Sequence, residues 1–336
     1  MDGLGRATVG CSALDVGRFP GAMKVPTPLS FRPLFMERVW GGDRLATMPG
    51  KGAPAGAPIG ESWELVDRED AQSVVARGPH AGVTLHELWT KFRAEVFGTA
   101  LPDSPRFPLL AKILDAQDTL SVQVHPPAEM AAELKGEPKT EMWYLLDATK
   151  DAALYAGFRR GTTRAEFESA LENGGVTELL HRVPVRAGDA MFIPSGRCHA
   201  IGAGCLIVEI QQNSDTTYRV FDWNRTGLDG KPRALHIAES LASIDFADHE
   251  PALAQPAGET VVSCPLFQVE RWTLAAPRTD TSTEGVIFTV LSGGVECAGD
   301  RFSPGEFFIL PAAASRRTLT PTAPDTSLLR TTIPHR

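Results

Sequence analysis

Two histidines, one glutamate and one glutamine in this chain are of the types that bind a divalent metal ion. His199 ends the string Gly188-x5-Pro194-x-Gly196-x2-His199, in which a glycine turn precedes a short apolar strand. Pro194 and Gly196 then favour a tight corner. A histidine that follows such a corner on rigid backbone is well placed to bind a metal.

The upstream string from Leu120 to His125 reads Leu-Ser-Val-Gln-Val-His and alternates with the period of a β-strand. We expect the apolar side chains on one face, at Leu120, Val122 and Val124, and the polar ones on the other, at Ser121, Gln123 and His125. Three polar side chains on one face of a buried strand are costly unless a ligand or a metal binds them.

Glu141 begins a further strand-like run, Glu141-Met-Trp-Tyr-Leu-Leu146, and completes a set of nitrogen and oxygen ligands. We predict that the metal ligands are Gln123, His125, Glu141 and His199. Such a set suits Zn²⁺ and also Fe²⁺, Mn²⁺ or Co²⁺, and its lack of thiolates argues against a closed structural zinc site. Taken singly, a histidine can be a core residue, Glu141 can pair with Lys139, and Gln123 can bond to a sugar hydroxyl or a water.

The elements that must position these residues are those of a turn-rich β protein. The chain has 336 residues, enough for two domains, with 26 prolines and 31 glycines. Residues 1–25 lack a signal-peptide core and are expected to be a disordered extension. We expect a metal-binding catalytic domain with helical insertions over 26–250. A second domain is expected over 251–336, where Gly305-x5-Pro311 repeats the glycine-to-proline spacing without the histidine, which predicts no metal.

Two capping boxes predict helices. Thr84-Leu-His-Glu87 begins one that runs to about Val96, and Thr163-Arg-Ala-Glu166 begins one that ends at Gly174-Gly175. Apolar or alternating runs predict strands at 59–66, 109–114, 206–211, 266–272, 286–291, 307–310 and 328–332. Alternation in the strand over 206–211 places Glu209 on a polar face, where we expect it near the metal.

Charge and cysteine content exclude several classes of protein. The net charge of −8 argues against binding to nucleic acid, and no apolar run approaches membrane-spanning length. The five cysteines are odd in number and form no C-x-x-C motif, which indicates free thiols in a reducing compartment. Because residues 1–25 show no export signal, we expect a cytoplasmic protein. Cys198 precedes His199 on the chain, so we expect it to face away from the metal.

Several strings of this chain resemble those of a known family. They are Trp40-Gly-Gly, Ile59-Gly-Glu-Ser-Trp-Glu64, Leu120-Ser-Val-Gln-Val-His-Pro126, Lys139-Thr-Glu-Met-Trp-Tyr144, Pro194-Ser-Gly-Arg-Cys-His-Ala-Ile201 and Glu209-Ile-Gln-Gln-Asn-Ser-Asp-Thr-Thr-Tyr-Arg219. The chain is similar from about residue 26 onward to the short bacterial form of the type I mannose-6-phosphate isomerases, in the cupin superfamily. The resemblance implies a mainly β fold of two cupin-type (jelly-roll) barrels with a few short helices.

The resemblance also implies an activity, namely interconversion of mannose 6-phosphate and fructose 6-phosphate with one bound metal, usually zinc. By motif position, it implies metal binding by Gln123, His125, Glu141 and His199. Arg219 matches the family's active-site arginine. The positions that resemble substrate-contact or proton-transfer positions are Lys139, Ser121, Glu209 and Arg225.

An aldose–ketose isomerase that works through a cis-enediol needs an electrophile, a base and a cation for the phosphate. The metal and Arg219 can stabilise charge on the reacting oxygens. We expect Lys139 to be the base, with Glu209 as the rival, because Lys139 lies two residues before Glu141 on the same strand face. Arg225 is the residue we expect at the phosphate, with Ser121 as a hydrogen-bond donor.

Two other functions fit the metal pocket. A non-catalytic sugar-binding bicupin regulator would keep the histidines but would not need a lysine and an arginine beside them. A metal-dependent cupin oxygenase would need an apolar oxygen pocket rather than a run of polar residues. The polar run therefore favours the isomerase, with a phosphorylated hexose as partner and a monomer or homodimer as the assembly.

Overall fold

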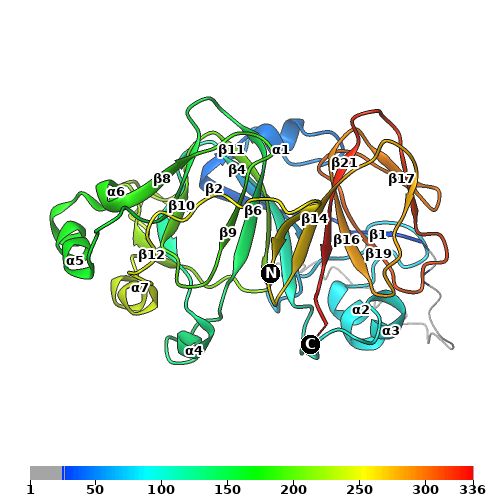
Figure 1. Ribbon diagram of the computed structural model, residues 1–336, viewed down its shortest axis with the longest axis horizontal. Coiled ribbons are helices and arrows are strands. Elements are labelled where there is room, and N and C mark those ends of the chain that lie inside the picture. The colour runs from blue at the N-terminus through cyan, green and yellow to red at the C-terminus, as the bar shows by residue number, and fades with distance from the viewer. Residues whose placement is uncertain (1–24, 26, 336) are drawn as a thin grey trace, which may run out of the picture.

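The computed structural model describes Val25 and residues 27–335, so the expected disordered extension lies outside the described residues except for Val25. Strands dominate the described part of the chain, and the helices are short, as predicted for a mainly β protein (Figure 1). None of these helices has the length and apolar character needed to cross a membrane.

Two sheets enclose the site. The larger has the strand order β2 (Leu34–Gly42), β3 (Ile59–Leu65), β4 (Leu109–Ala116), β11 (Cys205–Gln212), β6 (Glu141–Ala148), β9 (Ala190–Ile193). The smaller has the order β12 (Tyr218–Phe221), β5 (Val122–Val124), β10 (His199–Ile201), β7 (Ala153–Phe158), β8 (Leu180–Pro184). Apolar side chains from both sheets, such as Trp143 and Leu154, pack into one cluster, so the two sheets face each other.

A second pair of sheets forms the C-terminal half. Its larger sheet has the order β1 (Leu29–Ser30), β19 (Phe307–Leu310), β16 (Val286–Ser292), β21 (Ser327–Thr332), β14 (Gln268–Thr273), β13 (Thr260–Ser263). Its smaller sheet has the order β15 (Arg278–Thr279), β20 (Thr318–Pro321), β17 (Val295–Cys297), β18 (Asp300–Phe302). The division at residue 250 stays a prediction, and β1 crosses it because it pairs with β19.

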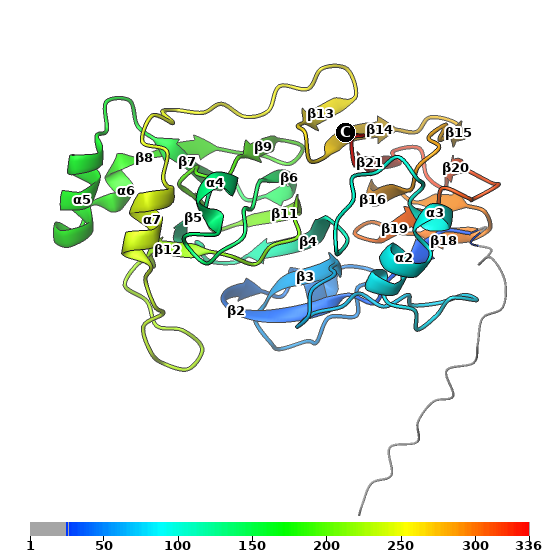
Figure 2. The ribbon, with the colours of Figure 1, turned by 90° about the horizontal axis from the view of Figure 1, so that it is seen from below.

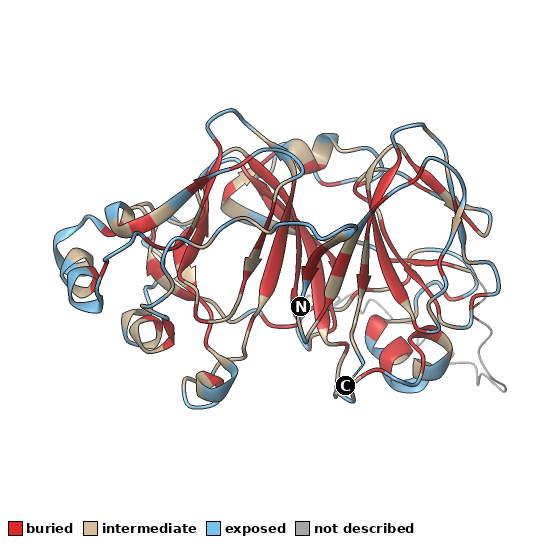
Figure 3. Ribbon diagram, in the orientation of Figure 1, coloured by how far each residue is buried: buried red, intermediate tan, exposed pale blue. Residues whose placement is uncertain are grey.

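The two larger sheets pack against each other through their outer faces. Val208 and Ile210 of β11 share one apolar cluster with Val269 of β14 and Leu329 of β21. Buried residues therefore run through the middle of the molecule, while exposed residues lie on loops and helix surfaces (Figure 3). The site-bearing sheet β4–β11–β6 is consequently packed from behind against the C-terminal half.

The helices flank the sheets. They are α1 (Arg44–Thr47), α2 (Leu85–Lys91), α3 (Arg93–Val96), α4 (Ala128–Ala131), α5 (Arg164–Asn173), α6 (Val176–Leu179) and α7 (Ile237–Ser243). Both predicted capping boxes are confirmed, at Thr84 and at Thr163. The helix predicted to begin at Thr84 is interrupted at Phe92, whose φ of −127° is not helical, and so forms the two short helices α2 and α3. In Figure 2, α5, α6 and α7 lie together beside the smaller sheet.

The predicted strands are confirmed with small shifts at their ends, and one prediction within them is wrong. Val122 and Val124 pack on the outer face of β5 with Cys198, as expected. Leu120, however, packs in the cluster between the two sheets, on the opposite side from Val122. It lies before β5 begins, so the strand alternation does not reach it.

Candidate metal centre and active site

Three of the four predicted metal ligands converge on one point. One nitrogen each of His125 and His199 and one oxygen of Glu141 lie within 4.8 Å of one another, and all three residues are buried. They come from the end of β5, the start of β10 and the start of β6, respectively. Antiparallel pairing of β10 with β5 sets His199 opposite Gln123, so the fourth predicted ligand joins the group.

The histidine rings are oriented as metal ligands are. Nδ1 of His125 lies 2.8 Å from the carbonyl oxygen of Thr216, and Nδ1 of His199 lies 2.8 Å from that of Arg197. Since Nδ1–H donates to a carbonyl in each case, Nε2 carries the free lone pair. The two Nε2 atoms lie 3.6 Å and 3.5 Å from the carboxylate oxygens of Glu141.

Two further observations fit a cation at this point. Oε1 of Glu141 is buried without a hydrogen-bond partner among the described residues, while Oε2 forms a 3.1 Å ion pair with Nζ of Lys139. The amide of Gln123 lies 3.2 Å from Nε2 of His199, and a flip of the amide turns its oxygen toward the same point. A divalent metal would satisfy the glutamate, the amide oxygen and both imidazoles at once.

The protonation states agree with this ligand set. Burial lowers the pKa of His199 to about 3 and takes the pKa of His125 well below its usual range, so both rings are neutral, as metal ligands must be. Burial and the nearby charge of Glu209 raise the pKa of Glu141 to about 7. A bound divalent cation would favour the ionised carboxylate again.

Lys139 lies beside the ligands, on the same face as Glu141, as predicted. Its Nζ is 3.1 Å from Oε2 of Glu141 and 3.4 Å from Nε2 of His125. Its side chain is buried, yet it also lines a cavity of about 600 Å³ that borders the metal ligands. Gln123 lines the same cavity, so these two residues connect the buried ligand group to the open space.

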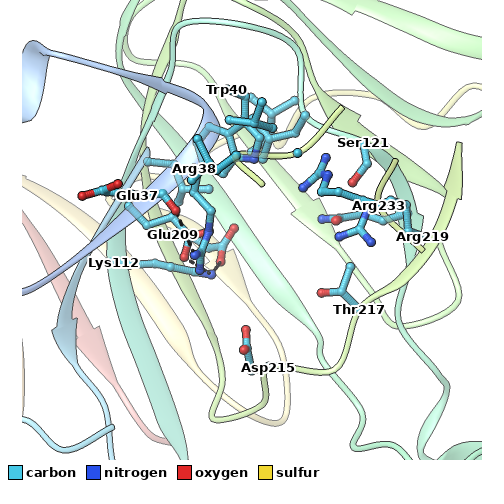
Figure 4. A pocket seen from close by; sticks show the side chains of 18 of the residues that line it. Glu37, Arg38, Trp40, Lys112, Ser121, Glu209, Asp215, Thr217, Arg219 and Arg233 are labelled. Atoms are coloured by element: carbon cyan, nitrogen blue, oxygen red, sulfur yellow. Dashed lines mark hydrogen bonds and ion pairs between the residues drawn. The ribbon is translucent and has the colours of Figure 1, made fainter. Parts of the chain in front are cut away.

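The cavity gathers most of the other predicted site residues (Figure 4). Those in its lining are Ser121, Gln123, Lys139, Glu209 and Arg219. Arg219 lies opposite Gln123 in the pairing of β12 with β5, so Arg219, Gln123 and His199 form a row across three strands. Arg225 is absent from the lining, because its guanidinium points to Asp222, with Nε 3.1 Å from the carboxylate.

A buried network of charges forms one wall of the cavity. Nζ of Lys112 lies 3.0 Å from Glu209 and 3.7 Å from Glu61, and the Glu209 carboxylate also accepts a 2.8 Å hydrogen bond from Trp143. Burial raises the pKa of Glu209, but Lys112 and Lys139 lower it more. Glu209 is therefore an ionised carboxylate with both oxygens engaged.

A cluster of ion pairs around Glu137, here called the Glu137 clamp, joins the segments that carry the site. The carboxylate of Glu137 is bound by Arg68, at 2.9 Å, and by Arg106, and both guanidiniums also donate to the carbonyl of Asn213. The backbone N–H of Glu137 donates to the hydroxyl of Thr216, whose carbonyl orients His125. Glu137 therefore fixes the strand start that presents Lys139 and Glu141, although Glu137 itself does not line the cavity.

Sequence reasoning missed Lys112, Glu61, Arg38 and Arg233, which all line the cavity. Lys112 had a signal, since one lysine within the apolar strand Leu109–Ala116 must be paired if the strand is buried. Glu61 had a similar signal in the all-buried strand β3. Arg38 and Arg233 had none, because an arginine in an edge strand or a polar loop is ordinarily exposed.

Comparison with known proteins identifies relatives of this chain. A model of the type I phosphomannose isomerase catalytic domain matches residues 29–152. The chain is 40% identical over 302 residues to mannose-6-phosphate isomerase ManA of Bacillus subtilis, with coverage of 84% of this chain and 93% of that protein. It is 39% identical over 276 residues to mannose-6-phosphate isomerase of Streptococcus mutans, with coverage of 79% and 85%.

Solved structures share the fold. The crystal structure of mannose 6-phosphate isomerase from Bacillus subtilis superposes with a TM-score of 0.81 at 31% identity, over 91% of this chain and 100% of that one. A putative mannosephosphate isomerase from Archaeoglobus fulgidus, 21% identical, superposes with a TM-score of 0.75 over 92% and 98% of the chains. From its sequence relatives and its site, this chain belongs to the type I mannose-6-phosphate isomerase family.

Proposed function

We propose that this chain interconverts mannose 6-phosphate and fructose 6-phosphate with one divalent metal ion, Zn²⁺ being the first choice for its ligand set. Gln123, His125, Glu141 and His199 would hold the metal. The observation that carries the proposal is the buried carboxylate of Glu141 facing two oriented imidazoles, next to a cavity lined by Lys139 and Arg219. A sugar-binding regulator has no need of that lysine and arginine.

The reaction moves a proton between C1 and C2 of the open-chain sugar. When bound, the metal supplies a Lewis acid that polarises the oxygens on those carbons. Arg219 can stabilise the negative charge that develops there, because its guanidinium stays protonated. Burial and the charge of Arg233 lower the pKa of Arg219, and both effects make an anionic partner more favourable.

We assign the proton transfer to Lys139 and keep Glu209 as the rival. Both side chains line the cavity. Both oxygens of Glu209 are engaged, by Lys112 at 3.0 Å and by Trp143 at 2.8 Å, which limits its freedom to accept a proton. Lys139 would act as the base, taking the proton from C2 and returning it to C1 on the same face.

The metal requirement gives the test. We expect purified protein to isomerise mannose 6-phosphate in a coupled assay, to lose the activity with a chelator, and to regain it with Zn²⁺. His199→Ala should contain less than one tenth of the wild-type metal by elemental measurement, whereas His181→Ala, on strand β8 outside the site, should retain it. Full activity after complete metal removal would refute the proposal.

Two broader assignments accompany this function. We propose that each pair of facing sheets is a cupin-type barrel, supported by the matching turns at Gly188 and Gly305, which both have positive φ and precede a strand and a proline. We also propose a reducing cytoplasmic setting, supported by Cys198, Cys205 and Cys297, which are buried as free thiols.

A further inference from the structure

The corner that precedes His199 is bound to a distant segment by an ion pair with two hydrogen bonds. The corner comprises residues 194–198 and joins β9 to β10. Nε and Nη2 of Arg197 donate to the two carboxylate oxygens of Asp248, at 2.7 Å and 2.9 Å. Asp248 lies 51 residues further along, in the chain that runs from α7 past the smaller sheet (Figure 2). Only 13% and 15% of the two side chains is exposed, and such a two-bond pair restricts the geometry of both partners.

The same arginine orients a metal ligand through its backbone. The carbonyl oxygen of Arg197 lies 2.8 Å from Nδ1 of His199. A carbonyl that accepts from Nδ1–H fixes the tautomer and the ring orientation, and it leaves Nε2 for the metal. Nη1 of Arg197 also donates to the carbonyl of Phe192 in β9, at 2.5 Å. The guanidinium is therefore bound to β9 on one side and to Asp248 on the other, and the backbone of the same residue carries the orienting carbonyl.

Strand β7 holds both His199 and Asp248 in place. It pairs with β10 so that His199 lies opposite Ala156. Two residues further along β7, the N–H of Phe158 donates a 2.9 Å hydrogen bond to the carbonyl of Asp248. Gly157 lies between them with a φ of +62°, and a Cβ atom there would lie 2.5 Å from the same carbonyl oxygen and 2.9 Å from the Asp248 carboxylate. This close approach requires a glycine, and it fixes Asp248 relative to the metal ligand.

The corner also contacts the segments that carry other site residues. The N–H of Gly196 donates a 2.9 Å hydrogen bond to the carbonyl of His125. The hydroxyl of Ser195 accepts a 3.1 Å hydrogen bond from the N–H of Lys139. A displacement of the corner would therefore reach both imidazoles of the ligand set and the lysine beside them.

We propose that Arg197 and Asp248 are positioning residues of the metal centre, because their ion pair holds the carbonyl that orients His199 and thereby tightens binding of the divalent metal. The inference rests on the proposed function, since both concern the same metal ion. Neither side chain lines the active-site cavity, so the pair acts through His199 rather than on the sugar.

The metal affinity of Arg197→Met separates positioning from charge. Removal of a positive charge would by itself favour a bound cation. Loss of positioning has the opposite sign, and we expect the dissociation constant for Zn²⁺ to rise about 10- to 100-fold, as for other lost partners of metal-binding histidines. Competition with a chromophoric chelator measures the constant on metal-free protein whose folding is checked by circular dichroism. Arg197→Lys keeps the charge without the two-bond geometry and should raise the constant by a smaller factor.

Two comparisons exclude a role in stability alone. Arg330 has a similar exposure, 14%, and binds Asp280 at 2.6 Å and Glu270 at 2.8 Å in the C-terminal half. Arg330→Met should therefore leave the Zn²⁺ constant within about twofold of wild type, because it removes a similarly buried ion pair far from the metal ligands. In Arg197→Met/Asp248→Asn, the rise should match that of Arg197→Met rather than the product of the two single changes, because the pair acts as a unit.

The same measurements distinguish failure of this inference from failure of the proposed function. A Zn²⁺ constant that is unchanged or lower in Arg197→Met, or that rises equally in Arg330→Met, would overturn the inference and leave the metal site itself in place. Wild-type protein that binds no Zn²⁺ would overturn both. If Arg197→Met does not fold, Arg197→Lys decides: a rise of at least about threefold supports the inference, and an unchanged constant overturns it.

Discussion

Replacing Lys112 by methionine tests whether the buried charge network in the cavity wall stabilises the fold. Lys112 is 4% exposed and lies 3.0 Å from Glu209 and 3.7 Å from Glu61. Glu61 keeps a 2.9 Å ion pair with Arg38, whereas Glu209 keeps the hydrogen bond from Trp143 and the charge of Lys139 but no ion pair. An unpaired charge in a buried site costs about 3–5 kcal/mol, and we expect Lys112→Met to lose that much stability at pH 8.

The loss should depend on pH. In the wild-type protein the pKa of Glu209 lies below its ordinary value, so its pairing stabilises the fold above the unfolded-state pKa and is lost as pH falls through the folded-state pKa. In Lys112→Met, burial acts without the main opposing charge and raises that pKa. Glu209 then takes up a proton at a higher pH than in the wild type, so the difference in unfolding free energy from wild type should be smaller at pH 5 than at pH 8.

Urea unfolding of the metal-free proteins at both pH values measures this difference. Lys91→Met is the matched control, because Lys91 forms an exposed 2.9 Å ion pair with Glu87 on α2 and should change stability by less than about 0.5 kcal/mol. Adding Glu209→Gln to Lys112→Met should restore part of the stability. A cost below about 1 kcal/mol at pH 8, or an equal cost at both pH values, would show that the reasoning is wrong.

Two further predictions concern catalysis. Of Lys139→Met and Glu209→Gln, the variant that removes the base should lose at least about 100-fold in kcat, and a loss below about tenfold clears that residue. Glu137→Ala should lower kcat about tenfold with metal content retained, because its clamp positions Lys139 from outside the cavity. Glu259→Ala, which breaks an exposed ion pair in the C-terminal half, should not change kcat; equal losses in both would exclude a positioning role for Glu137.

Local patterns in the sequence were sufficient to predict most of the helices and strands. The capping boxes at Thr84 and Thr163 form as predicted, because they involve only residues three positions apart. The alternation of Gln123 and His125 against Val122 and Val124 holds because strand pleating fixes it. The pattern failed at Leu120, where the strand had not yet begun, and strand ends depend on pairing partners that are distant in the sequence.

For the candidate site, too, some features could be predicted from the sequence and others depend on the tertiary structure. The four ligand types and their strands could be identified from the sequence, but the distances between them depend on sheet pairing between residues about 70 to 76 positions apart. Arg225 and Arg233 illustrate the difference, since both lie in the same polar stretch and differ only in which side of Asp222 they occupy. Lys112 acquires its partners only because β4 pairs with both β3 and β11.

What the sequence by itself determined is therefore the chemistry that the chain carries: two imidazoles, a carboxylate and an amide on strands, with a lysine and an arginine in the same motifs. Only the tertiary structure decided which charges share one cavity, which pair with each other beneath it, and which arginines line it. The physical reason is that side-chain type and strand period are local properties, whereas charge pairing and burial depend on which distant strands become neighbours.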